Sequence, residues 1–241
     1  NLSNITITDS VISIGDFAFS NSTSLRSVTI PDSVTIIGVS AFYDCKNLIN
    51  VTLPDSITSI DYSVFSDCTS LTNITIPDSV TNIGDSAFEC CTSLTNITIP
   101  DSVTSIGDYA FEFCESLTNI TIPDSVTSIS DYAFEYCASL TSVTIGNSVT
   151  DIGYAAFSGC DNLKNIYYKG SQEEWNKINI RDNNNNLTNA TIYYNFIACT
   201  QNNHNYFGDW TVVKEATCTT TGLKQRTCSY DGYTETIVIP A

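Results

Sequence analysis

LTNITIPDSVTNIGDSAFECCTS, residues 71–93, is the stretch that decides the fold, because near copies of it precede and follow it. Leucine and phenylalanine recur through the chain at a strict 23-residue step. The leucines are Leu2, Leu25, Leu48, Leu71, Leu94, Leu117, Leu140 and Leu163, and the phenylalanines are Phe19, Phe42, Phe65, Phe88, Phe111, Phe134 and Phe157. A fixed period of this length indicates a solenoid, a propeller or an array.

One copy of the repeat shows which side chains face inward. Ile74-Thr75-Ile76 alternates apolar and polar residues, as a strand with one buried face must. Pro77 lacks the N–H that a strand ladder needs, so it ends the strand. Gly84-Asp85 is expected to open a short helical turn with Asp85 as its N-cap. The predicted inward residues are Leu71, Ile74, Ile76, Val80, Ile83, Ala87, Phe88 and Cys91.

The pattern predicts an α/β repeat solenoid, a right-handed superhelix with a parallel strand sheet and short convex helices. We expect repeats over residues 1–168, a C-terminal solenoid cap with a final strand over residues 169–195, and a small β-rich, cysteine-containing module over residues 196–241. The final strand is expected from Leu187 to Ile192, one residue off register. No matching cap precedes Leu2, so we expect the natural chain to continue N-terminally.

The segment after the eighth strand departs from the repeat. Ser171 to Glu174 reads as a capping box, with serine at the N-cap and glutamate three residues later. Trp175, Ile178 and Ile180 follow. We therefore expect a helix that covers the open end of the core, since a terminal turn must shield its apolar layer.

Composition excludes several classes of partner. The net charge is −17, and the stretch between Asn47 and Leu163 has 15 Asp or Glu and no Lys or Arg. Nucleic-acid binding and docking on anionic lipid both need clustered cations, so neither is expected. No run of about 18 apolar residues predicts a membrane helix, and no signal peptide is recognisable at the start of the sequence.

Six cysteines keep the repeat step: Cys45, Cys68, Cys91, Cys114, Cys137 and Cys160. Equivalent side chains on stacked turns point the same way, whereas a disulfide needs Cβ vectors that converge. The sequence therefore predicts a column of small, buried, reduced thiols. Residues 196–241 read instead as three short strands with turns near Gly222 and Gly232.

The repeated unit LxxIxIPxSVTxIGxxAFxxC resembles the BspA-like leucine-rich repeat of bacterial and protist surface proteins, and the resemblance covers residues 2–168. The segment from Tyr167 to Tyr194 is similar to the terminal cap of such proteins in gut Firmicutes. The resemblance implies secretion, surface attachment and binding to host or microbial partners. It also implies an extracellular or cell-surface location.

The tail resembles a small cysteine-bearing module of the same surface proteins. That module usually ends in Cys-x-x-Cys-Gly, and here Asp231 stands where the second cysteine is expected, which disfavours a zinc site. Cys218 and Cys228 flank one hairpin and are candidates for a disulfide, although Cys199 is an alternative partner for either.

Three rows of polar residues remain on the surface. The outward face of the strands is the candidate binding surface, against the alternative that its threonines only favour strand structure. Its candidate residues are Asn50, Thr52, Asn73, Thr75, Asn96, Thr98, Asn119, Thr121, Ser142 and Thr144.

The second and third rows are acidic. Asp9, Asp32, Asp55, Asp78, Asp101 and Asp124 are expected to cap turns, with weak calcium binding as the alternative. Asp85, Asp108 and Asp131, with Glu89, Glu112 and Glu135, are expected at helix starts and in solvent on the convex side.

Catalytic patterns are missing from the sequence. His204 is the single histidine and no nucleophile is placed beside it by the pattern, while the acids repeat where an active site needs one unique arrangement. No enzyme activity and no cofactor are expected. The sequence favours a non-catalytic extracellular interaction or adhesion module of a bacterial cell-surface protein, binding a protein or glycan. A passive spacer and an ancillary domain of a secreted enzyme are the alternatives.

Overall fold

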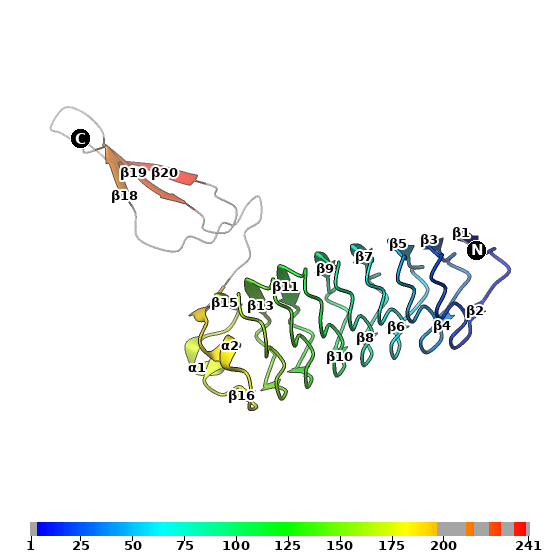
Figure 1. Cartoon of the computed structure of the whole chain (residues 1–241). Coiled ribbons are helices and arrows are strands. Elements are labelled where there is room, and N and C mark those ends of the chain that lie inside the picture. Colours follow the sequence, from blue (N-terminus) through cyan, green and yellow to red (C-terminus); the bar gives the residue numbers. More distant parts are fainter. Residues whose placement is uncertain (1–3, 197–210, 215–221, 228–233, 240–241) are drawn as a thin grey trace. The chain divides into compact units, whose positions relative to one another are not determined.

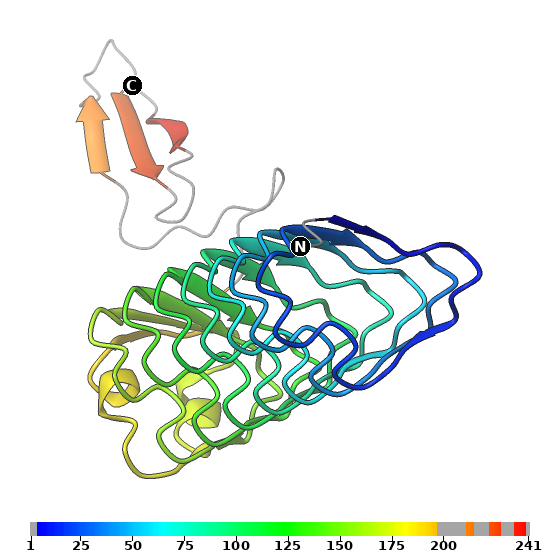
Figure 2. The same cartoon turned by 45° about the vertical axis from the view of Figure 1, so that its right-hand side comes forward.

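The computed structural model describes residues 4–196, 211–214, 222–227 and 234–239. The chain divides into two compact units, residues 1–194 and 195–241. In the first unit, successive turns lie side by side along one axis (Figures 1 and 2). The predicted solenoid is confirmed, because parallel strands of neighbouring turns pair at the 23-residue step of the sequence.

One side of the solenoid consists of parallel strands, as predicted, and these strands pair in three consecutive sheets of three, two and four strands. Within residues 4–196 its strands are β1 (Asn4–Thr6), β3 (Ser27–Thr29), β5 (Asn50–Thr52), β7 (Asn73–Thr75), β9 (Asn96–Thr98), β11 (Asn119–Ile122), β13 (Ser142–Ile145), β15 (Asn165–Tyr168) and β17 (Thr191–Tyr193). In the pair β7–β9, Asn73 lies opposite Asn96 and Thr75 opposite Thr98. Ile74 between them is buried, so polar side chains face outward and apolar ones inward.

A second side consists of two-residue strands that the sequence pattern does not predict. They are β2 (Ser13–Ile14), β4 (Ile36–Ile37), β6 (Ser59–Ile60), β8 (Asn82–Ile83), β10 (Ser105–Ile106), β12 (Ser128–Ile129), β14 (Asp151–Ile152) and β16 (Asn179–Ile180). Beside them, the Thr81 hydroxyl donates to the carbonyl of Thr58 one turn earlier at 3.2 Å, and Thr104 donates to Thr81 at 3.2 Å. Strands this short leave no alternation to detect.

The third side of each turn was expected to hold a short helix, and this expectation is wrong. In the fourth turn, Ser86 and Cys90 have positive φ angles of 54° and 56°. This left-handed conformation interrupts a right-handed helix. The Glu89 N–H closes a tight turn on the carbonyl of Ser86 (3.2 Å), whereas the Phe88 N–H donates to Ala110 in the next turn (2.8 Å). Hydrogen bonds between turns thus replace those within a helix.

The core confirms the predicted inward positions. All eight predicted residues of the fourth turn are buried, and the most exposed of them is only 5% exposed. The seven phenylalanines of the repeat form one stacked column with neighbouring ring centroids 5.2–5.6 Å apart. Each turn therefore covers the core of the next.

The cysteine column is confirmed as six buried, free thiols. Each thiol donates to the carbonyl of the phenylalanine in the preceding turn, as Cys91 does to Phe65 at 3.2 Å and Cys114 to Phe88 at 3.3 Å. Burial raises the pKa of Cys91 well above its ordinary value. The neighbouring Cys90 lies outside this column and is half-buried.

The predicted capping box is confirmed at α1 (Gln172–Trp175). The N–H of Glu174 donates to Ser171 Oγ at 3.3 Å, and the N–H of Ser171 donates to the Glu174 carboxylate at 2.7 Å. The helix lies at the end of the solenoid (Figure 2), where Trp175 packs edge-on against Tyr168 with ring centroids 5.2 Å apart. Helix α1 therefore covers the last layer of the core.

The final strand begins later than predicted. Leu187 belongs to a second short helix, α2 (Asn185–Thr188), and is fully buried at the same end of the solenoid. Strand β17 pairs with β15 so that Ile192 lies opposite Ile166, 26 residues earlier. The added residues come before α2, because Asn179 of β16 lies opposite Asp151, 28 residues earlier, and the stretch that leads to β16 contains α1. Within the described residues, no helix is long and apolar enough to cross a membrane.

The second unit contains three described strands, β18 (Thr211–Lys214), β19 (Gly222–Thr227) and β20 (Thr234–Ile239), which pair antiparallel in that order. Gly222 is the first residue of β19 and pairs with Ile239, and the connection that precedes it lies outside the described residues. Gly232, Cys199, Cys218, Cys228, Asp231 and His204 lie outside the described residues.

Replacing Phe111 with alanine should lower the free energy of unfolding by about 3–5 kcal/mol, because the side chain is fully buried between Phe88 and Phe134 and its loss leaves a cavity. Chemical denaturation measures the change. An unchanged midpoint would contradict the proposed register of the core.

The six column cysteines should resist thiol reagents in the native protein, because burial disfavours the reactive thiolate. After denaturation without reductant, all six should be labelled, and mass spectrometry of the peptides identifies them. Rapid labelling of Cys91 or Cys114 in the folded chain would contradict their burial. The labelling rate of half-buried Cys90 in the same sample is the internal comparison.

Candidate binding surface

The outward side chains of strands β5 to β13 form two straight rows, which we call the strand face. The structure places all ten predicted residues on it: Asn50, Thr52, Asn73, Thr75, Asn96, Thr98, Asn119, Thr121, Ser142 and Thr144. The first eight are exposed, whereas Ser142 and Thr144 are half-buried. Paired strands lie about 4.8 Å apart, so the rows present amides and hydroxyls at a regular spacing.

Side chains next to the strand face hold its amides in place. The Thr95 hydroxyl donates to the carbonyl of Thr72 in the preceding turn at 3.2 Å. The amide of Asn96 donates to that same Thr95 hydroxyl at 3.4 Å, and Asn119 donates to Thr118 at 3.1 Å. These bonds orient the asparagines toward one side and leave their carbonyl oxygens as acceptors.

The threonine row ends in two tyrosines beside the cap. Tyr167 lies opposite Thr144 in the strand register, and Tyr193 lies opposite Tyr167. The two rings stack with centroids 5.2 Å apart and an interplanar angle of 21°. Tyr193 was not predicted, because β17 pairs with β15 at a step of 26 residues and not at the 23-residue step of the repeat.

The first aspartate row caps backbone groups of neighbouring turns. The Asp55 N–H donates to the Asp32 carboxylate at 3.1 Å, and the Asn147 N–H donates to Asp124 at 3.1 Å. Among the described residues, no three acidic, histidine or cysteine side chains are arranged to hold a metal ion. The geometry therefore gives the calcium alternative no support.

The aspartates expected at helix starts have a different role from the predicted one. Asp85 does not cap its own turn, because its carboxylate accepts the N–H of Asp108 in the next turn at 2.9 Å. Asp108 accepts from the N–H of Asp131 at 3.1 Å, and Asp131 from that of Tyr154 at 2.8 Å. These carboxylates join neighbouring turns, and their charge is partly offset by the N–H groups that they accept.

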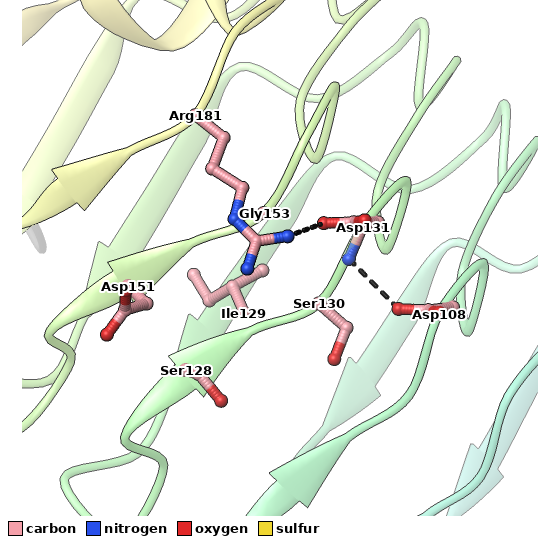
Figure 3. A pocket seen from close by; sticks show the side chains of 8 residues that line it. All are labelled: Asp108, Ser128, Ile129, Ser130, Asp131, Asp151, Gly153 and Arg181. Carbon is pink, nitrogen blue, oxygen red and sulfur yellow. Dashed lines mark hydrogen bonds and ion pairs between the residues drawn. The ribbon is translucent and has the colours of Figure 1, made fainter.

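A polar hollow of about 280 Å³ lies where this row meets the cap (Figure 3). Its lining residues are Asp108, Ser128, Ile129, Ser130, Asp131, Asp151, Gly153 and Arg181. Arg181 reaches across it to Asp131 at 3.0 Å, and the Asn179 amide donates to Asp151 at 3.0 Å. That bond lowers the pKa of Asp151. The Arg181–Asp131 ion pair and the Asn179–Asp151 hydrogen bond therefore hold the cap against the repeats.

The repeats match a family model for the BspA type leucine rich repeat region, in 6 copies, over residues 1–118 and 81–207. The chain belongs to this family. The resemblance seen in the sequence is thereby confirmed. Proteins with BspA-type repeats are generally cell-surface, protein-interaction modules and are typically non-catalytic.

Two solved structures support the same assignment. A leucine-rich repeat protein of T. pallidum is 32% identical, with a TM-score of 0.62 over 67% of this chain and 78% of that chain. A leucine-rich repeat protein of Bacteroides ovatus is 27% identical, with a TM-score of 0.54 over 73% of this chain and 59% of that chain. A comparison with curated proteins gives no match.

Glutamates stack in this BspA-type chain where the repeat places them on the third side. Glu112 lies between Glu89 and Glu135 of the neighbouring turns. Burial, followed by the charges of these two carboxylates, raises the pKa of Glu112 to about 7. Burial raises the pKa values of Tyr109 and Cys90, and the charge of Glu112 adds to both increases. Near neutral pH, Glu112 is thus a carboxyl that readily holds a proton.

A raised folded-state pKa means that Glu112 contributes stability that is fully present below its unfolded pKa and is lost as pH rises through about 7. Glu112→Gln should therefore raise Tm relative to the parent chain at pH 8, by about 1–3 °C, and much less at pH 5. Thermal unfolding at the two pH values measures it. Glu173→Gln, at an exposed residue of α1, removes the same charge as a control. An equal change of Tm after Glu112→Gln and Glu173→Gln would contradict the raised pKa of Glu112.

Proposed function

We propose that this chain is an extracellular interaction or adhesion module of a bacterial cell-surface protein, and that it binds a host or microbial protein or a glycan on the strand face. One observation supports the choice of face above others. Asn73, Thr75, Asn96 and Thr98 are exposed, uncharged and aligned across paired strands.

The energetics favour this face for a partner that carries little charge. Its side chains stand on hydrogen-bonded strands, and Asn96 and Asn119 are oriented by neighbouring threonines. Groups that are already ordered lose little entropy on binding, so modest hydrogen bonds can sum to useful affinity. Each turn contributes little, so the partner should span several turns, and single substitutions should have small effects.

The Tyr167–Tyr193 pair adds an aromatic contact at one end of the rows. Tyrosine combines a large apolar ring with a hydroxyl that hydrogen-bonds, which suits both protein and sugar partners. A ligand that runs along the strand face would therefore meet amides and hydroxyls first and aromatic rings beside the cap.

Replacing Thr75, Thr98 and Thr121 together with lysine should abolish binding, because three charged side chains would displace the hydroxyls of the central turns. The fold should persist, since all three residues are exposed. Binding of the parent chain to a glycan array and to a panel of purified surface proteins identifies ligands, and the variant is then tested on each.

Glu89, Glu112 and Glu135 replaced together with glutamine provide the matched control when binding is measured at about pH 8, because Glu112 is then mostly ionised and both triple variants change the net charge by nearly the same amount. The glutamine triple should retain the ligands of the strand face. A ligand lost by the glutamine triple and kept by the lysine triple would bind the third side of the solenoid, and the strand-face proposal is wrong if every ligand behaves in this way. Absence of any ligand in both screens would favour a passive spacer.

A further inference from the structure

The third side of the solenoid carries a second surface, distinct from the strand face, in which acidic and aromatic side chains alternate. We call it the acidic–aromatic face. Its residues are Tyr62, Asp85, Glu89, Asp108, Tyr109, Glu112, Phe113, Asp131, Tyr132, Glu135 and Tyr136. Tyr62 is 53% exposed and Tyr136 46%, so large rings meet solvent beside the carboxylates.

The aromatic side chains of this face are ordered by stacking. Tyr109 and Tyr132 stack with centroids 4.7 Å apart, and Phe113 and Tyr136 with centroids 4.8 Å apart. Tyr109, Phe113, Tyr132 and Tyr136 all have positive φ angles, between 55° and 59°. Apart from Phe17, the equivalent positions of the other turns hold small or polar residues, namely Ser40, Ser63, Ser86 and Ala155 in one column and Asn21, Asp44, Asp67, Cys90 and Gly159 in the other. The fold therefore does not require aromatic residues here.

A hollow of about 360 Å³ opens at the start of the stack. Its lining residues are Tyr62, Asp85, Ser86, Glu89, Asp108, Tyr109 and Glu112. Ser86 precedes Tyr109 in the same column by one turn, and its small side chain leaves space on the side of Tyr109 away from Tyr132. The hollow thus combines four carboxylates with two tyrosine rings.

The carboxylates of this hollow lack cationic partners within the repeats. No Lys or Arg occurs between Asn47 and Leu163. Arg181 of the cap pairs with Asp131, and it also lies beside Asp108 in the neighbouring hollow, so Asp85, Glu89 and Glu112 are the carboxylates of this hollow that lie away from it. The Asp85 and Asp108 carboxylates each accept a backbone N–H, and Glu112 is crowded by two other glutamates. A positive charge placed here would relieve this repulsion.

We propose that the acidic–aromatic face binds a lysine- or arginine-rich segment of a partner polypeptide. Charge complementarity selects cations, and the rings select cations that have an apolar stem. A lysine or arginine head can lie among Glu89, Asp108 and Glu112, while its methylene chain packs against Tyr62 or Tyr109. The proposal is independent of the strand face, which is uncharged and would serve a different partner.

The test uses the full chain and a fluorescent peptide of alternating lysine and serine, with binding followed by anisotropy at about 0.15 M salt. Replacing Glu89, Glu112 and Glu135 together with glutamine should weaken binding by about tenfold or more. The Thr75, Thr98 and Thr121 lysine triple changes the net charge in the same direction, and by at least as much, on the other face, and it should change affinity less than about threefold. Failure of the strand-face proposal would leave this comparison intact.

A second variant tests the rings without altering charge. Replacing both Tyr109 and Tyr132 with serine introduces the residue that Ser40, Ser63 and Ser86 already provide at the same backbone conformation. Circular dichroism confirms folding of each variant. Replacing both tyrosines should weaken peptide binding by about threefold or more, because the methylene chains of the lysines lose their apolar contact.

Three outcomes would overturn the proposal. Equal weakening by the glutamine and lysine triples would indicate long-range attraction to an acidic protein and no defined face. Unchanged affinity for the peptide after replacement of Tyr109 and Tyr132 with serine would show that the rings do not contribute to binding. Binding of spermine as tight as that of the peptide, with both lost together on adding salt, would indicate adsorption of any polycation.

Discussion

Each turn of this solenoid is held by hydrogen bonds to the turns on either side, and the rest of the structure depends on that pairing. The bonds occur on all three sides: along β7 and β9, along the two-residue strands such as β8 and β10, and from Phe88 to Ala110 on the third side. Side chains add to them, since Thr81, Cys91 and Asp85 each bond to the backbone of a neighbouring turn. A single turn has no helix and no closed core of its own, so it is stable only when stacked.

The same pairing places like residues next to like residues, about 4.8 Å apart, whatever their chemistry. For apolar residues the consequence is favourable, as the stacked phenylalanines and buried thiols show. For acids it is unfavourable, and the chain offsets the repulsion in two ways. Asp85 and Asp108 accept backbone N–H groups of the next turn, whereas Glu112 keeps a proton up to about neutral pH. Strict repetition, together with burial, therefore raises the pKa of Glu112 at the centre of the glutamate row.

The features that the sequence predicts are those that follow from hydrophobic period and local capping chemistry. The inward residues of the repeat, the buried cysteines and the Ser171 capping box agree with the structure because each depends on a few neighbouring residues. The helix predicted after Gly84 is wrong because the geometry there depends on bonds to the next turn and on positive φ at Ser86 and Cys90. The rows of the strand face follow from the alternation of Ile74, Thr75 and Ile76. The hollow beside Tyr109 cannot be predicted from such local alternation, because it brings together residues from three turns.

A repeat of this kind can separate two recognition surfaces because different positions of the unit form different sides. Substitutions at Thr75 and its equivalents alter the strand face and leave the third side unchanged, and those at Glu112 do the reverse. The two sides also differ in what they permit. The strand face is uncharged and uniform, so a partner can bind at several registers along it. The acidic–aromatic face changes from turn to turn, since Ser86, Tyr109 and Tyr132 occupy equivalent positions. That break in the repetition defines one location on an otherwise periodic surface, and a partner that binds there is held in a single register.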